Sequence, residues 1–155
     1  MRVLIMGSPT SEGMRCFNHD ISVGGGGWVE NLVTELRYLN VIELFVAFYA
    51  DFARDVEILQ IVNPDVVHIM GTEREHDLRL LELAGPDKTV ASITGMISYC
   101  AKHYFGGIEQ REFKKRTLGD IIRRGGPIKE RETFCRLGQF EKKMISELKY
   151  VTGRT

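Results

Sequence analysis

Four consecutive glycines, Gly24 to Gly27, are the residues of this chain best suited to bind an anion. They stand just before Trp28, where the spacing of apolar residues predicts that a helix begins. Glycines leave their backbone N–H groups uncovered, and the dipole of a helix favours an anion at its N-terminus. The spacing matches neither the Gly-x-Gly-x-x-Gly dinucleotide motif nor the P-loop. The glycines therefore indicate a phosphate site, and a plain flexible turn is the competing interpretation.

The bulk composition narrows the class of protein. The chain has 155 residues, 43% of them hydrophobic, and its 21 Lys and Arg residues balance 21 Asp and Glu residues. This balance argues against nucleic acid as the main partner. Cys16, Cys100 and Cys135 form no CxxC pair and no metal-ligand pattern, so we interpret them as reduced thiols of a cytosolic protein. No apolar run approaches the roughly 20 residues that span a bilayer.

Strand and helix patterns alternate along the chain, which is typical of an α/β fold. Strands are expected at 3–6, 42–49, 66–70, 89–93 and 150–152, and helices at 28–39, 52–62, 76–84 and 129–149. The part between 97 and 127 is mixed, with one or two short helices expected. The alternation predicts a Rossmann-like three-layer sandwich with a mainly parallel sheet and helices on both faces. Ligands of such sheets bind beyond the carboxyl ends of the strands.

Four segments together resemble the N-terminal half of a GT-B glycosyltransferase of family 4. The glycines with the first helix look like the glycine-rich loop of that family, and Pro64–Glu73 looks like its Pro-Asp-Val-Val-His strand. Ser92–Ile97 stands where the family often has a strand followed by His-Gly, and Lys149–Thr155 resembles its last strand before the second domain. The segment Ala101–Phe105 is similar to a bacterial surface-polysaccharide subgroup. The order and spacing of these segments, rather than one motif, carry the likeness.

This resemblance implies a function. Residues 1–155 would be a single acceptor-side domain, the N-terminal half of a GT-B fold, with the C-terminal donor domain absent from the chain. The full-length enzyme would transfer a sugar, with retention, from a nucleotide-sugar to a carbohydrate or lipid-linked acceptor, without a cofactor or a metal ion. Its partners would be these substrates and the missing domain, not nucleic acid. The resemblance is compatible with a cytoplasmic protein that associates peripherally with the inner face of the membrane. The chain alone is expected to be inactive.

The resemblance also implies site residues, although it assigns no catalytic residue within this chain. The four glycines would face the donor diphosphate. The acceptor site is expected to draw on several loops: His19, Glu73, Thr94, Gly95, His103 and Tyr104. Each has a plainer interpretation. Glu73 could cap the helix that follows it, and His103 could be a surface histidine of a loop that only packs on the long C-terminal helix.

The sequence departs from the family pattern at two places, and it leaves two alternatives to the glycosyltransferase function. Thr94 replaces the histidine that contacts the donor sugar in the family, and the link from Tyr49 through Asp51 is short. The main alternative is a stand-alone, flavodoxin-like module that binds a nucleotide or phosphate without catalysis. A non-catalytic interaction domain is the third. His68, inside an apolar strand, is interpreted as a hydrogen-bonded structural histidine, and the basic run at 111–116 as a solvated face.

Overall fold

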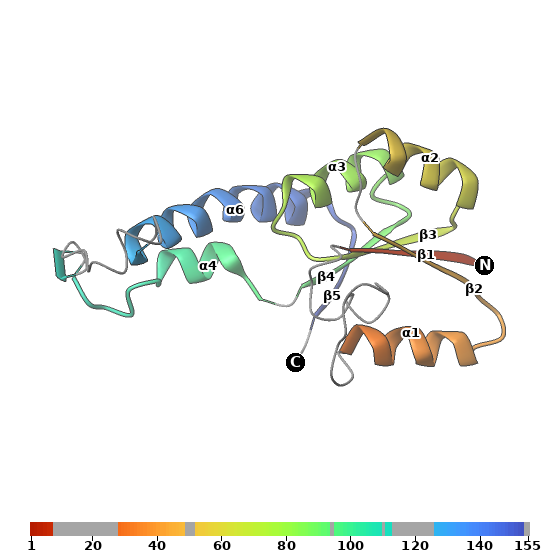
Figure 1. Ribbon diagram of the computed structural model, residues 1–155, viewed down its shortest axis with the longest axis horizontal. Coiled ribbons are helices and arrows are strands. Elements are labelled where there is room, and N and C mark those ends of the chain that lie inside the picture. Colours follow the sequence, from red (N-terminus) through yellow and green to blue (C-terminus); the bar gives the residue numbers. More distant parts are fainter. Residues whose placement is uncertain (8–27, 49–51, 94, 110, 113–125, 154–155) are drawn as a thin grey trace.

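The computed structural model describes residues 1–7, 28–48, 52–93, 95–109, 111–112 and 126–153. Strands and helices alternate in it as the sequence predicts, with bounds within two residues of those expected (Figure 1). The strands are β1 (Arg2–Gly7), β2 (Glu43–Phe48), β3 (Val66–Met70), β4 (Thr89–Ile93) and β5 (Tyr150–Gly153). The helices are α1 (Trp28–Tyr38), α2 (Phe52–Val62), α3 (Glu75–Ala84), α4 (Ile97–Lys102) and α6 (Pro127–Glu147).

The five strands form one sheet in the order β2-β1-β3-β4-β5, and every pairing in it is parallel. Leu4 of β1 stands between Phe45 of β2 and Val67 of β3, which fixes the register at the centre of the sheet. The predicted α/β fold with a Rossmann-like parallel sheet is therefore confirmed. The strand order reverses between β1 and β3, and crevices at such a switch point are where open α/β sheets bind ligands.

Helices cover both faces of the sheet, as a three-layer sandwich requires. Figure 1 shows α2, α3 and α6 on one face and α1 on the other. Alternate residues of a strand point to opposite faces, so Val67 and Ile69 of β3 enter the core beneath α2, α3 and α6, with Leu81 and Met144. The smaller core beneath α1 is built around Ile5 and Val33. Among the described helices, none has the length and apolar character needed to cross a bilayer.

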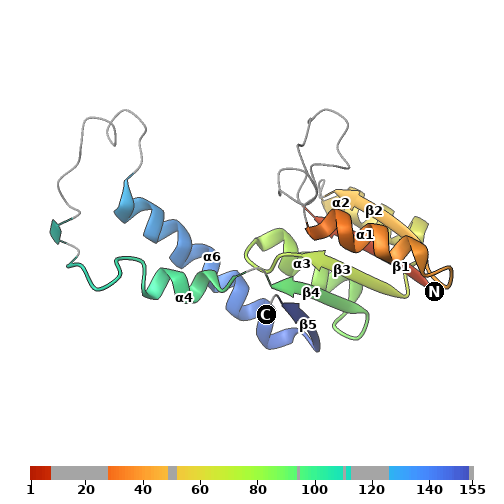
Figure 2. The ribbon, with the colours of Figure 1, turned by 90° about the horizontal axis from the view of Figure 1, so that it is seen from below.

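Helices α4 and α6 lie side by side and extend away from the sheet on its carboxyl side (Figures 1 and 2). Two residues of α6 hold this pair together. Glu141 is fully buried, and its two carboxylate oxygens accept hydrogen bonds from the N–H groups of Ile97 and Ser98, at 2.9 and 2.8 Å. These N–H groups open α4 and would otherwise have no partner within the helix. Gly138 permits the close approach, because a Cβ there would lie 2.8 Å from Cα of Ser98.

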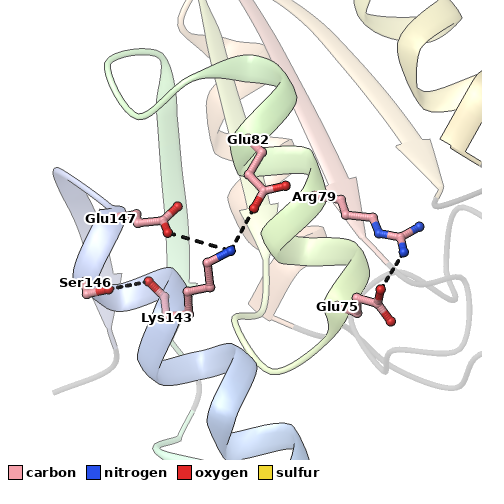
Figure 3. A network of polar contacts seen from close by, with 6 residues as sticks. All are labelled: Glu75, Arg79, Glu82, Lys143, Ser146 and Glu147. Atoms are coloured by element: carbon pink, nitrogen blue, oxygen red, sulfur yellow. Dashed lines mark hydrogen bonds and ion pairs between the residues drawn. The ribbon is translucent and has the colours of Figure 1, made fainter.

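The second half of α6 lies beside α3, where an exposed ion-pair network joins the two helices (Figure 3). Lys143 Nζ lies 3.0 Å from a carboxylate oxygen of Glu82 in α3 and 4.0 Å from one of Glu147 in α6. The hydrogen bond to Glu82 raises the pKa of Lys143. Water and salt screen exposed pairs of this kind, so the network orients the surface more than it stabilises the fold.

Candidate functional site

The carboxyl ends of β1 and β3 meet at the switch point, so the residues that follow them are the first candidates for a site. Strand β3 ends at Met70, and Gly71, Thr72 and Glu73 lead from it toward α3. Gly71 has a φ of 129°, which a residue with a side chain rarely adopts. A Cβ on Gly71 would also lie 3.0 Å from Oε2 of Glu73. Only a glycine lets the chain turn here with the Glu73 carboxylate folded back over the turn.

Glu73 lies at the edge of the sheet, partly exposed. Its Oε2 accepts a hydrogen bond of 3.1 Å from the N–H of Thr72. The residue before α3 is Arg74, and its N–H donates instead to Oδ2 of Asp77, at 2.9 Å. The capping role therefore belongs to Asp77 rather than to Glu73. Glu73 has a second carboxylate oxygen with which it could accept a ligand hydroxyl, since an ionised carboxylate offers about four acceptor sites.

Thr72 stands between these residues with a polar atom that the fold leaves unused. The residue is fully buried, and its hydroxyl Oγ1 has no hydrogen-bond partner in the described part of the chain. Leaving a buried hydroxyl unsatisfied costs about 1–3 kcal/mol. A bound hydroxyl, phosphate oxygen or water could supply the missing partner, because threonine both donates and accepts. Thr72 is therefore a candidate ligand-binding residue of this edge.

An aspartate–histidine pair beside this edge was missed by the sequence reasoning. Asp55 lies in the first turn of α2 and His76 in the first turn of α3, and Oδ2 of Asp55 contacts Nε2 of His76. The Asp55 side chain is 3% exposed and that of His76 is 28% exposed. The pair joins the N-terminal ends of two helices that follow β2 and β3, the strands on either side of β1. The sequence signal that could have indicated this pair is a polar residue in the first turn of each of two helices that follow a strand.

His68 has the structural role that the sequence predicts. Its Nε2 lies 2.7 Å from the hydroxyl oxygen of Ser92 on the adjacent strand β4. Burial lowers the pKa of His68 below its ordinary value of 6.5, because the sheet disfavours the charged imidazolium. The two side chains lie on the face of the sheet opposite Val67 and Ile69. His68 is thus held neutral inside the sheet rather than presented to a substrate.

The structure separates the expected acceptor residues into two places. Glu73 follows β3 and Gly95 follows β4, so both stand at the carboxyl edge of the sheet. His103 and Tyr104 come after the last residue of α4, and α4 leads away from the sheet (Figure 1). The described residues therefore do not bring Glu73 together with His103 and Tyr104 in one site. The acceptor role of each of these residues stays a prediction.

Tyr104 packs on α6, as expected if its loop only packs against the long C-terminal helix. Its ring meets that of Phe134 edge to face, with centroids 5.5 Å apart. Its hydroxyl donates to Oε2 of Glu130 at 2.6 Å, and this bond raises the pKa of Tyr104. His103 instead contacts the ring of Tyr99, at a centroid distance of 4.4 Å.

Several predicted site residues lie outside the described residues. These are Gly24, Gly25, Gly26 and Gly27 of the expected diphosphate site, and His19 and Thr94 of the expected acceptor site. The short link from Tyr49 to Asp51 and most of the basic run at 111–116 are also outside them. The diphosphate site therefore stays a prediction from the sequence.

Neither the metal-ligating side chains of the described residues nor the comparisons with known proteins give a further indication of function. Within the described ranges, no group of three or more His, Cys, Asp or Glu side chains is arranged to hold a metal ion. Comparisons with protein-family models, with curated proteins and with solved structures find no match to this chain. The fold and the carboxyl edge of its sheet are thus the basis for any functional assignment.

Proposed function

We propose that this chain is the acceptor-side half of a retaining GT-B glycosyltransferase that moves a sugar from a nucleotide-sugar to a carbohydrate or lipid-linked acceptor. One observation supports the proposal most. In the parallel sheet, β1 and β3 are neighbours at the switch point, so the glycine loop after β1 and Gly71–Glu73 after β3 start from one edge. These are two of the segments that carry the resemblance to this family.

The residues of this edge have the chemistry that the proposal needs. Glu73 can accept a hydrogen bond from a sugar hydroxyl, and the unpartnered Oγ1 of Thr72 can take part in another. Backbone N–H groups of Gly24–Gly27 would bind the diphosphate, on which negative charge grows as the bond to the sugar breaks. Preorganised N–H donors stabilise such charge. A donor domain outside this chain would bind the nucleotide and complete the cleft.

A stand-alone module that binds a nucleotide or phosphate is the second candidate. The strand order β2-β1-β3-β4-β5 favours it, because flavodoxin-like proteins have the same order and hold a flavin mononucleotide at the same switch point. This candidate uses the glycine loop in the same way, but it needs neither a saccharide nor a second domain.

Isothermal titration calorimetry with three classes of ligand tests the proposal. The purified chain would be titrated with short oligosaccharides, with nucleotide-sugars and with flavin mononucleotide. We expect binding of an oligosaccharide, which Thr72→Val weakens and Thr133→Val, the same change on distant α6, leaves alone. Binding of flavin mononucleotide without any saccharide would favour the second candidate. Failure of all three ligands to bind would contradict both.

A further inference from the structure

Strand β2 has the sequence of a central strand but lies at an edge of the sheet. Its residues 44–48 are all apolar, and continuous apolar runs are typical of parallel strands that are covered on both faces. Among the described strands, however, β2 has a single neighbour, β1. Five of the six residues of β1 are buried, whereas every residue of β2 keeps part of its surface exposed. The edge position therefore leaves apolar surface of β2 uncovered.

Both faces of β2 take part in the packing of the sheet. Leu44, Val46 and Phe48 pack against the smaller core beneath α1, and Phe45 and Ala47 pack against the larger core on the other face. Both helical layers thus reach β2. A further strand at its open edge would extend the same two cores.

The two edges of the sheet differ in their protection against pairing with other strands. At one edge, β5 has four residues and directly follows Lys149, and short strands and lysines are common devices against such pairing. At the other edge, β2 has six residues without proline or glycine, and its one charged residue, Glu43, is the first of them. Strand β2 is therefore an open, uncharged edge of the kind that accepts another strand.

We propose that β2 pairs in antiparallel fashion with β2 of a second copy of this chain, so that the two sheets join into one. A two-fold axis normal to the sheet keeps each face on its own side, so residues opposite each other must come from the same face. The register centred on Val46 meets this condition. It places Leu44 opposite Phe48 of the second copy. It likewise places Phe45 opposite Ala47 of the second copy.

Charge favours a second copy of the chain as the occupant of this edge. Each pair in the register joins two apolar residues, and pairs of aromatic and β-branched residues stabilise antiparallel strands. Glu43 already has an ion-pair partner in its own chain, because its Oε2 lies 3.2 Å from Nε of Arg2. Glu43 is three positions from Val46, so the two copies of Glu43 would lie about 20 Å apart at about 3.4 Å per residue. This separation exceeds the Debye length of about 8 Å at physiological ionic strength, so the two carboxylates would hardly repel each other.

Antiparallel pairing also determines how the two copies face. Their strands run in opposite directions, so the carboxyl edges of the two sheets point away from each other, and each copy keeps its own Glu73 and Gly95 accessible. The pairing is separate from the function proposed above and does not depend on it.

Sedimentation velocity of the purified chain over a wide range of concentrations tests the pairing. We expect a reversible dimer with twice the 17.6 kDa mass of the chain. High salt should leave this dimer intact, because the paired residues are uncharged. Val46→Lys places two lysines directly opposite each other and should raise the dimer dissociation constant at least about tenfold. Val151→Lys makes the same change on β5, at the other edge, and should leave the dimer unchanged.

Disulfide trapping keeps the proposal testable if Val46→Lys disturbs the partly buried strand. In a chain whose native cysteines are replaced by serine, Val46→Cys should form a linked dimer under oxidising conditions. The reason is that opposite Cα atoms of antiparallel strands lie about 4.5–5.5 Å apart, which a disulfide can span. Leu44→Cys is the control on the same face, because it would lie about 14 Å from its own copy in this register.

Three results would overturn the proposal. A monomer at every concentration would do so, as would equal trapping of Val46→Cys and Leu44→Cys. Equal weakening by Val46→Lys and Val151→Lys, with masses that grow beyond the dimer, would show instead that β2 pairs head to tail with β5 of another copy and forms open chains.

Discussion

A single hydroxyl group, Oγ1 of Thr72, links the fold of this chain to its chemistry. It is buried at the carboxyl end of β3 and lacks a hydrogen-bond partner in the described part of the chain. A fold that gains nothing from this atom should tolerate its loss. Replacing an unsatisfied buried polar group by an apolar one of the same shape is neutral or stabilising.

We therefore predict that Thr72→Val leaves the free energy of unfolding unchanged or raises it by up to about 1 kcal/mol, while it weakens ligand binding. Urea denaturation measures the first effect and calorimetry the second. A loss of more than about 2 kcal/mol on unfolding would mean that the hydroxyl has a structural partner after all.

His68 gives the fold a dependence on pH whose sign follows from its burial. The folded state lowers the pKa of His68 below 6.5, so as pH falls through that value the unfolded chain takes up a proton that the folded chain does not. The stability contributed by neutral His68 is full above about pH 6.5 and is lost as pH falls toward the lower pKa of the folded state.

The corresponding prediction is that the free energy of unfolding falls between neutral and mildly acidic pH, and that His68→Gln flattens this fall. Urea denaturation on either side of pH 6.5 makes the comparison, with His103→Gln as an exposed control that keeps the full dependence. An identical pH profile for the His68 variant and the unchanged chain would show that His68 titrates alike in both states.

The sequence identifies part of the candidate site and misses the rest for a physical reason. Glu73 and Gly95 could be placed at the carboxyl edge because each follows a strongly apolar strand directly. The pair of Asp55 and His76 could not, since it depends on α2 and α3 lying side by side, and apolar spacing within one helix carries no information about its neighbour.

At the scale of elements, the contact between α4 and α6 decides whether these two helices stay side by side. Gly138 lets the two helices approach, and Glu141 satisfies the first N–H groups of α4. A methyl group at position 138 would meet the backbone of Ser98, which cannot move without shifting α4.

Gly138→Ala should therefore lower the free energy of unfolding by about 1–2 kcal/mol, because the cost of overpacking exceeds the gain in helix propensity. The same substitution at Gly95, where an added Cβ has nothing within 4 Å, is the control and should change stability little. Chemical denaturation of the two variants gives the comparison. A stabilised Gly138→Ala variant would show that helix propensity outweighs the contact.

The strands and longer helices of this fold could be predicted because their signals are local. Val66–Met70 is a short apolar run bounded by turn residues, and α6 repeats its apolar positions with a helical period. The arrangement of α4 beside α6 is not local. Ile97 and Glu141, which join α4 to α6, are 44 residues apart, and no periodicity within either segment indicates their contact.

For the whole molecule, the proposed function would require two domains, and this chain would be one of them. In the GT-B arrangement the nucleotide is bound largely by the second domain, so the purified 155-residue chain should transfer no sugar from any nucleotide-sugar. Radiolabelled nucleotide-sugars with a mixture of carbohydrate and lipid-linked acceptors provide the assay. Sugar transfer by the chain alone would contradict the proposal that a second domain must bind the nucleotide.

The most direct test of the central claim is to locate the saccharide that the chain binds. Backbone amide resonances of the ¹⁵N-labelled chain would be followed during titration with the oligosaccharide that binds most tightly in calorimetry. We predict that the shifts centre on Gly71, Thr72 and Glu73, with Gly95 beside them, and that Thr72→Val reduces the affinity they report. Shifts confined to α4 and α6, or to residues away from the carboxyl edge of the sheet, would contradict the claim that this edge is an acceptor site.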